Sequence, residues 1–208
     1  MKYLITESQY KLLVEQISGL DGLISRITET YKEIGESDKK QEYIDMIDKF
    51  ISDSGVKNIL VEEIKMGLGL SLSDRVIINT KAFSLTLPML IYVIFHEIAH
   101  QYQFKKYGAE KMYDCYTGEI NAAEGAELMK YIEEVADDFA LRKIRQLVKM
   151  GFPINPSELS GIKPMYKSVP LYHFVSLVEN VRGMIKSKNI TTPEKISEFF
   201  YNWVKVNL

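Results

Sequence analysis

Residues 87–100 have the sequence LPMLIYVIFHEIAH, in which an unbroken apolar run ends in two histidines and a glutamate. A helix that is apolar on every side is a buried helix. Thr86 is a suitable N-cap, Pro88 is tolerated in the first turn, and Gly108 is a suitable end. The run is too short to span a bilayer. This stretch therefore predicts a core helix with polar groups in its C-terminal half.

The polar end of this helix has the pattern H-E-x-x-H, formed by His96, Glu97 and His100. Residues four apart lie one turn above each other, so both imidazoles can bind a single Zn²⁺. Glu97 then faces the open side of the ion, where a carboxylate can take a proton from water. The alternative is that both histidines are hydrogen-bonded core residues. That alternative leaves a buried glutamate beside them with no ion.

A third ligand is expected, because a catalytic zinc has three protein ligands and a water. The candidate is Glu133, in a helix predicted for residues 121–150. Glu133 lies at the edge of the apolar face, whereas Glu134 and Asp138 point to a charged, solvated face. An ordinary amphipathic helix with acidic flanking residues is the alternative. The apolar face consists of Leu128, Ile132, Val135, Ala136, Phe139 and Ala140.

Asp137 follows Glu133 by one helical turn, on the same side. We expect its carboxylate to accept the second N–H group of a ligating imidazole and so to fix its tautomer. Ala99, Ala136 and Ala140 are small enough to let the two helices approach closely.

The pattern H-E-x-x-H, followed after about thirty residues by E-x-x-A-D-x-F-A, resembles the zincin metallopeptidases with a glutamate ligand (gluzincins). Among them the chain most resembles the ImmA/IrrE-like peptidases, over approximately residues 55–150. The resemblance implies an α+β fold, mainly helical and zincin-like, with a small β-sheet packed beside the H-E-x-x-H helix. It also implies His96, His100 and Glu133 as zinc ligands and Glu97 as the general base.

An oxyanion that develops during peptide hydrolysis needs the metal and one further donor. His173, Tyr166 and Tyr172 are candidates for this donor by residue type alone. His173 is also the one histidine outside the H-E-x-x-H pattern.

Length and composition favour one domain, because 208 residues with 46% hydrophobic content can bury one substantial core. We divide it into N-terminal helices (1–55), a zincin core with the metal site (56–150) and a C-terminal helical extension (151–208). A net charge of −2 gives no electrostatic reason to expect a nucleic-acid or membrane partner. The single cysteine, Cys115, excludes an internal disulfide and is expected to be a buried or idle thiol rather than a nucleophile.

The N-terminal sequence shows no signal peptide, so a cytoplasmic protein is expected. Residues 6–9 form a capping box before a predicted helix. Residues 2–9, KYLITESQ, resemble the start of many proteins of tailed bacteriophages. That resemblance adds a phage or host protein as a further partner, and association with the virion as a further location.

Other segments follow simpler patterns. Helices are predicted over about residues 22–35 and 39–53, and strands around 58–63 and 75–80, separated by the glycine-rich residues 66–70. We expect an edge strand that could bind an extended peptide at residues 79–83, although a plain structural edge strand fits that pattern equally well.

The C-terminal segment is expected to be a loop from Pro153 to about Pro170, followed by a helix over residues 171–186. Thr192 and Pro193 mark the start of a last helix. Its apolar face, which we expect to pack on the protein's own core, comprises Ile196, Phe199, Phe200, Trp203 and Val204.

These patterns predict a soluble zinc-dependent peptidase that acts on a peptide or protein substrate. The alternative is a non-catalytic protein that keeps the zincin fold for binding or assembly, such as a bacteriophage particle component. Glu97 favours the enzyme, because a purely structural zinc site needs no general base.

Overall fold

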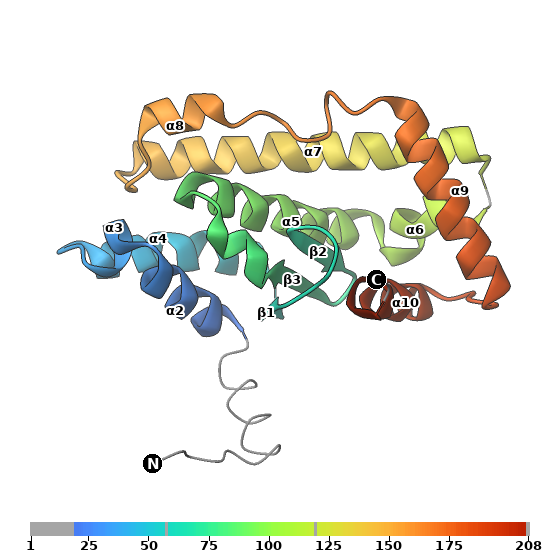
Figure 1. Cartoon of the computed structure of the whole chain (residues 1–208), viewed down its shortest axis with the longest axis horizontal. Helices are drawn as coiled ribbons and strands as arrows, with labels where there is room; N and C mark the ends of the chain where they lie inside the picture. Colours follow the sequence, from blue (N-terminus) through green and yellow to red (C-terminus); the bar gives the residue numbers. More distant parts are fainter. Residues whose placement is uncertain (1–18, 57, 119, 207–208) are drawn as a thin grey trace, which may run out of the picture.

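The computed structural model describes residues 19–56, 58–118 and 120–206, and the predicted capping box and phage-like segment lie outside them. The fold is α+β and mainly helical, with one small sheet (Figure 1). Its elements are α2 (Leu20–Thr30), α3 (Lys32–Gly35), α4 (Lys40–Ser52), β1 (Ile59–Glu62), β2 (Gly69–Leu72), β3 (Arg75–Asn79), the 3₁₀ helix η1 (Thr80–Ser84), α5 (Leu87–Tyr107), α6 (Ala109–Thr117), α7 (Ala122–Lys149), α8 (Pro156–Gly161), α9 (Leu171–Ser187) and α10 (Pro193–Val206).

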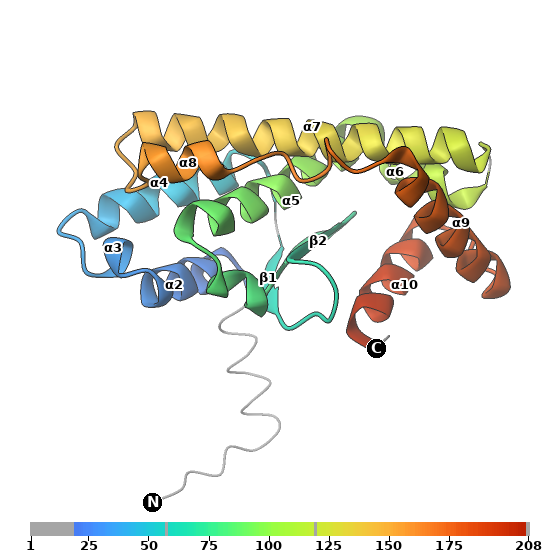
Figure 2. The ribbon, with the colours of Figure 1, turned by 45° about the horizontal axis from the view of Figure 1, so that its top comes forward.

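Helix α5 is the buried centre of the fold, as its apolar sequence predicts. It starts after Thr86, whose side chain makes no capping hydrogen bond, and ends at Gly108, which has a φ of 81°. Helix α7 runs along α5, and the sheet packs on another side of α5 (Figures 1 and 2). Ala99 and Ala136 are buried on these two helices, as expected of small residues at a close helix contact.

Helix α7 begins and ends close to the predicted positions. Asn121 caps it with a capping box, in which its side chain accepts the amide of Glu124 and the Glu124 carboxylate accepts the amide of Asn121. Met150 ends the helix, and Gly151 follows with a φ of 94°. The buried residues differ in part from the predicted face, because Asp137 is fully buried while Leu128, Ile132 and Val135 are only half-buried.

The sheet has the strand order β1-β3-β2, with β1 parallel and β2 antiparallel to β3. Two of its strands were predicted, but the third, Gly69–Leu72, falls partly in the glycine-rich segment interpreted as a separator. The prediction of an edge strand at residues 79–83 is wrong. Residue 79 ends the central strand, and residues 80–84 form η1.

Asn79 fixes the loop between β1 and β2 from inside the protein. Its fully buried amide donates to the carbonyl oxygens of Ile64 and Gly67, both at 2.7 Å. Its side-chain oxygen accepts the amide of Lys81 at 3.1 Å. The loop that leads into β2 is therefore tied to the end of the central strand.

Helices α9 and α10 pack on the rest of the protein at the end opposite α2, α3 and α4 (Figures 1 and 2). The expectation that α10 packs on the protein's own core is confirmed. The C-terminal loop differs from the prediction, because it contains the short helix α8. The apolar cluster that joins the sheet to α9 and α10 includes Leu72, Ile77, Val181, Ile185, Ile196, Phe199, Phe200 and Val204.

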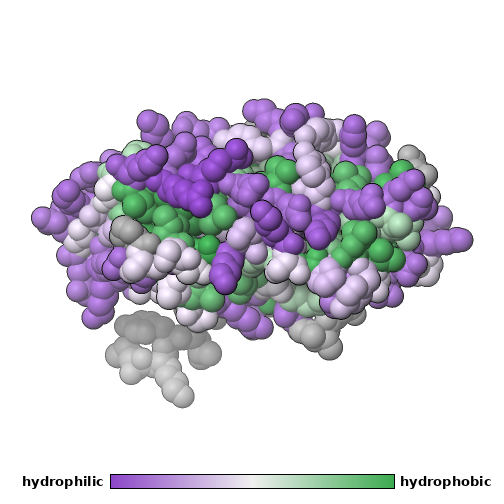
Figure 3. Space-filling view, turned by 90° about the horizontal axis from the view of Figure 1, so that it is seen from above, coloured by the Kyte–Doolittle hydropathy of each residue, from purple (hydrophilic) through white to green (hydrophobic). Residues whose placement is uncertain are grey.

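The face on which α7 and α8 lie is largely hydrophilic, with smaller apolar areas between the polar side chains (Figure 3). No helix within the described ranges has the length and apolar character needed to cross a membrane.

Candidate metal centre

The three predicted ligands, His96, His100 and Glu133, meet between α5 and α7. His96 Nε2 lies 3.2 Å from His100 Nε2 and 3.1 Å from Glu133 Oε2, and His100 Nε2 lies 3.6 Å from the same oxygen. Both histidines are buried, and the Glu133 side chain is 15% exposed. These donors form a group that could hold a metal ion.

The separations between the donors fit a tetrahedral ion. With metal–ligand bonds of about 2.0–2.2 Å, tetrahedral geometry separates two donors by roughly 3.3–3.6 Å. The three observed separations are 3.1, 3.2 and 3.6 Å, so little movement is needed to bind an ion. The donor chemistry, two imidazoles and one carboxylate, suits a divalent transition metal.

The other nitrogen of each ring is already bound. His96 Nδ1 lies 3.0 Å from Asp137 Oδ1, and His100 Nδ1 lies 2.7 Å from Gln103 Oε1. If each Nδ1 carries the proton and donates it to the oxygen, each Nε2 presents a lone pair to the centre. Two lone pairs and a carboxylate oxygen at these distances repel one another unless a cation or a proton lies between them.

Asp137 lies where the sequence predicted, fully buried behind His96. Its Oδ1 also accepts the hydroxyl of Tyr92, and its Oδ2 accepts the backbone amide of Tyr166 at 2.9 Å. The Tyr166 ring stacks on the His96 ring, with centroids 5.5 Å apart. The segment after α8 therefore holds both the orienting carboxylate and the imidazole.

Without a cation, protons compensate the charge of this group. Burial opposes the charged form of His96, but its hydrogen bonds to Asp137 and Glu133 outweigh burial and raise its pKa to about 10. Burial also opposes ionisation of Glu133, but the charges and hydrogen bonds of the two histidines lower its pKa to about 2. A metal ion must therefore displace a proton from this centre when it binds.

Glu97 is buried beside the three donors and does not belong to the group itself. Burial is the main cause that raises the pKa of its carboxyl group. Its carboxylate lies against the backbone of Gly69 on β2, where an added Cβ would be 2.6 Å from Glu97 Cγ and 2.7 Å from Oε1. This approach of strand to carboxylate is possible only because residue 69 has no side chain.

Gln101, which directly follows His100 in α5, joins this helix to β2. Its side-chain amide donates to Ser71 Oγ at 2.5 Å and to the carbonyl oxygen of Leu72 at 2.6 Å. The position of β2 relative to Glu97 is thus set by polar contacts as well as by packing.

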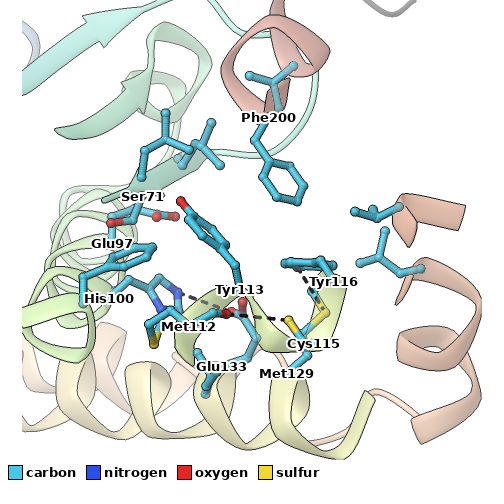
Figure 4. A pocket seen from close by; sticks show the side chains of 18 of the residues that line it. Ser71, Glu97, His100, Met112, Tyr113, Cys115, Tyr116, Met129, Glu133 and Phe200 are labelled. Atoms are coloured by element: carbon cyan, nitrogen blue, oxygen red, sulfur yellow. Dashed lines mark hydrogen bonds and ion pairs between the residues drawn. The ribbon is translucent and has the colours of Figure 1, made fainter. Parts of the chain in front are cut away.

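A cavity of about 240 Å³ opens at this centre (Figure 4). His96, Glu97, His100 and Glu133 line one end of it, and all four residues of β2 contribute. The labelled side chains of Tyr116, Cys115 and Met129 lie toward the other end (Figure 4).

Of the remaining predicted residues, some line the cavity and others lie away from it. Tyr166 lines the cavity, whereas Tyr172 is 63% exposed and His173 is exposed on α9. Neither Tyr172 nor His173 is among the lining residues, so the structure brings only Tyr166 of the three candidate donors to this centre. Glu134 points away and forms an ion pair with Lys130 at 3.9 Å. Asp138 is exposed, as predicted.

Sequence reasoning missed Gln103, Tyr92 and Gly69. Gln103 follows His100 by three positions on the same helix face, so helical spacing could have identified it. Tyr92 precedes His96 by one turn and could have been found in the same way. Gly69 gave no local signal, because its role depends on a contact with a residue 28 positions later.

The chain matches no protein-family model, no curated protein and no solved structure. The function is therefore inferred from the protein's own residues.

Proposed function

We propose that this protein is a zinc-dependent metallopeptidase whose ligands are His96, His100 and Glu133 and whose general base is Glu97. The observation that carries the proposal is the buried carboxylate of Glu97 beside a three-donor centre of tetrahedral dimensions. A structural ion needs no such carboxylate, and a closed structural site has four protein ligands.

When bound, a zinc ion would polarise a water molecule and lower its pKa to about 7. With such a metal bound, Glu97 would accept a proton from the water and return it to the leaving amine. A carboxyl group with a raised pKa suits both steps, because its conjugate acid persists closer to neutral pH. Burial, followed by the nearby carboxylates, raises the pKa of the Tyr166 phenol, so it stays protonated and can donate to a developing oxyanion.

The strand beside Glu97 supports a peptide as the substrate. In the described part of the chain, β2 pairs with β3 alone, and its four residues line the cavity. A peptide in extended conformation can add to such an edge through main-chain hydrogen bonds. This mode of binding would bring a peptide carbonyl next to the metal centre.

The test is metal content and proteolysis, measured for the wild type, Glu97→Gln and the control Glu134→Gln. Wild type and control should bind one zinc per chain and cleave an unfolded protein such as reduced casein. Glu97→Gln should keep its zinc and lose cleavage by at least about 100-fold. If Glu97→Gln keeps full activity or loses its zinc, the assignment of the base is wrong. Zinc binding without cleavage by any of the three would favour the binding or assembly role.

A further inference from the structure

We infer that the end of the cavity away from the metal centre is a binding chamber for one large apolar side chain of the substrate, next to the scissile bond. The inference rests on the proposed function and adds the class of substrate. The apolar residues that line the cavity include Tyr116, Met129, Leu177, Val181 and Phe200. Figure 4 shows the Tyr116 and Met129 side chains toward the end away from Glu97 and His100, and we call this end the apolar chamber.

The chamber offers no charge to a ligand. The lining residues that can carry a charge at neutral pH, two histidines and two glutamates, all belong to the metal centre. Two hydroxyl groups that belong to lining residues already form hydrogen bonds. The Tyr113 hydroxyl lies 2.8 Å from Ser197 Oγ, and the Tyr116 hydroxyl lies 3.5 Å from Met129 Sδ. A charged side chain would lose its hydration there without compensation, whereas an apolar one gains from burial.

The size of the cavity fits an aromatic or long aliphatic side chain. A dry cavity of about 150 Å³ lined by apolar side chains is known to bind benzene. The cavity here has about 240 Å³, which leaves space at the metal end for a peptide carbonyl and a water.

The walls are held in place by polar contacts outside the chamber. Arg182 on α9 donates to the carbonyl oxygen of Cys115 at 3.0 Å, which fixes α9 against the end of α6. The backbone amide of Lys65 donates to the carbonyl oxygen of Val204 at 3.0 Å, which joins α10 to the loop after β1. Lys205 on the same helix forms an ion pair with Glu62 of β1. The chamber is therefore preformed, so little ordering opposes binding.

The first experiment compares peptides that vary only in the side chains flanking the cleaved bond. Peptides with Phe or Leu at one flanking position should be cleaved with a kcat/KM about 10–100-fold above those with Ala or Asp there. If the wild type cleaves these peptides with no such preference, the inference is overturned and the proposed function stands. If it cleaves none of them, the proposed function fails, and the second experiment still tests the chamber.

The second experiment measures binding without turnover, using zinc-loaded Glu97→Gln. 3-Phenylpropionohydroxamic acid should bind about 10–100-fold more tightly than acetohydroxamic acid, because both chelate zinc but one also fills the chamber. Adding Leu177→Trp, which fills the chamber, should remove this difference in affinity between the two hydroxamic acids. The matched control is Ser176→Trp, at the exposed neighbouring position. Equal affinities before Leu177 is changed, or a difference that survives Leu177→Trp, would overturn the inference.

A positively charged side chain in the chamber should make the enzyme prefer acidic over apolar substrate side chains, which gives a third test. In the active enzyme, Leu177→Arg should reverse the preference from Phe toward Asp or Glu, whereas Ser176→Arg should keep the wild-type order. Reversal cannot result from simple loss of folding, since it requires an active variant. If Leu177→Arg is active and still prefers Phe, Leu177 does not line the binding site and the inference fails.

Discussion

Gly69→Ala should move the carboxylate of the proposed base, Glu97, while leaving that carboxylate in the protein. A Cβ at residue 69 would lie 2.6 Å from Glu97 Cγ, and ordinary contact between such atoms needs about 3.5 Å or more. The atoms in conflict belong to the end of a flexible side chain, so the carboxylate would retreat by about 1 Å while the backbone stays.

A misplacement of about 1 Å in an active site can cost on the order of 100-fold in rate. This corresponds to about 2.7 kcal/mol of transition-state stabilisation. We expect kcat on a peptide substrate to fall by about that factor, with zinc content unchanged and the free energy of unfolding altered by less than about 1 kcal/mol. Stopped assays with a fluorescent peptide, zinc analysis and urea unfolding measure these quantities.

The matched control is Gly183→Ala in α9, where an added Cβ meets no atom within 4 Å. This variant should keep full activity and gain about 0.5–1 kcal/mol of stability, because alanine favours a helix interior over glycine. Wild-type kcat for Gly69→Ala would refute the reasoning. Loss of zinc by Gly69→Ala would refute it too, because the strand would then support the ligands rather than the base.

Three further predictions concern buried groups. Asp137→Ala should weaken zinc affinity by about 10–100-fold in a chelator competition, while Asp138→Ala stays within about 0.5 kcal/mol of wild-type stability. Equal effects at both positions would contradict the observed register. Burial raises the pKa of the Cys115 thiol to about 12, so it should react with a disulfide reagent at pH 8 only after unfolding in urea. Rapid labelling of the native protein would show that the thiol is accessible. Asn79→Ala should cost about 2 kcal/mol in urea unfolding, because the buried carbonyl group of Ile64 and the part-buried one of Gly67 lose their donor. The exposed Asn58→Ala should cost far less, and equal losses would refute this account.

The residues of the candidate metal centre could be predicted because the determinants within each of its two helices are local. His96 and His100 share a face through helical spacing alone, and the same spacing places Asp137 one turn after Glu133. The choice of Glu133 over Glu134 followed from the position of the apolar face. That His100 is bound by Gln103 follows from the same geometry, although the sequence reasoning did not include it.

The parts that were missed depend on distant segments. Glycine at residue 69 weakens any strand signal, and the strand forms because β3 and α5 supply its partners. Residues 79–83 follow directly after the apolar, strand-like run 76–78, but the Asn79 side chain binds the preceding loop and the chain turns into η1. The chamber could not be predicted, since α6, α9 and α10 meet only in the folded chain.

The position of the cavity between these helices has an evolutionary consequence. The proposed hydrolytic groups belong to α5 and α7, whereas much of the surrounding wall belongs to α6, α9 and α10. Substitutions in the wall can therefore accumulate without disturbing the reacting groups. Laboratory evolution toward a new cleavage preference should collect its changes in those three helices, so that one hydrolytic centre could serve many sequence preferences.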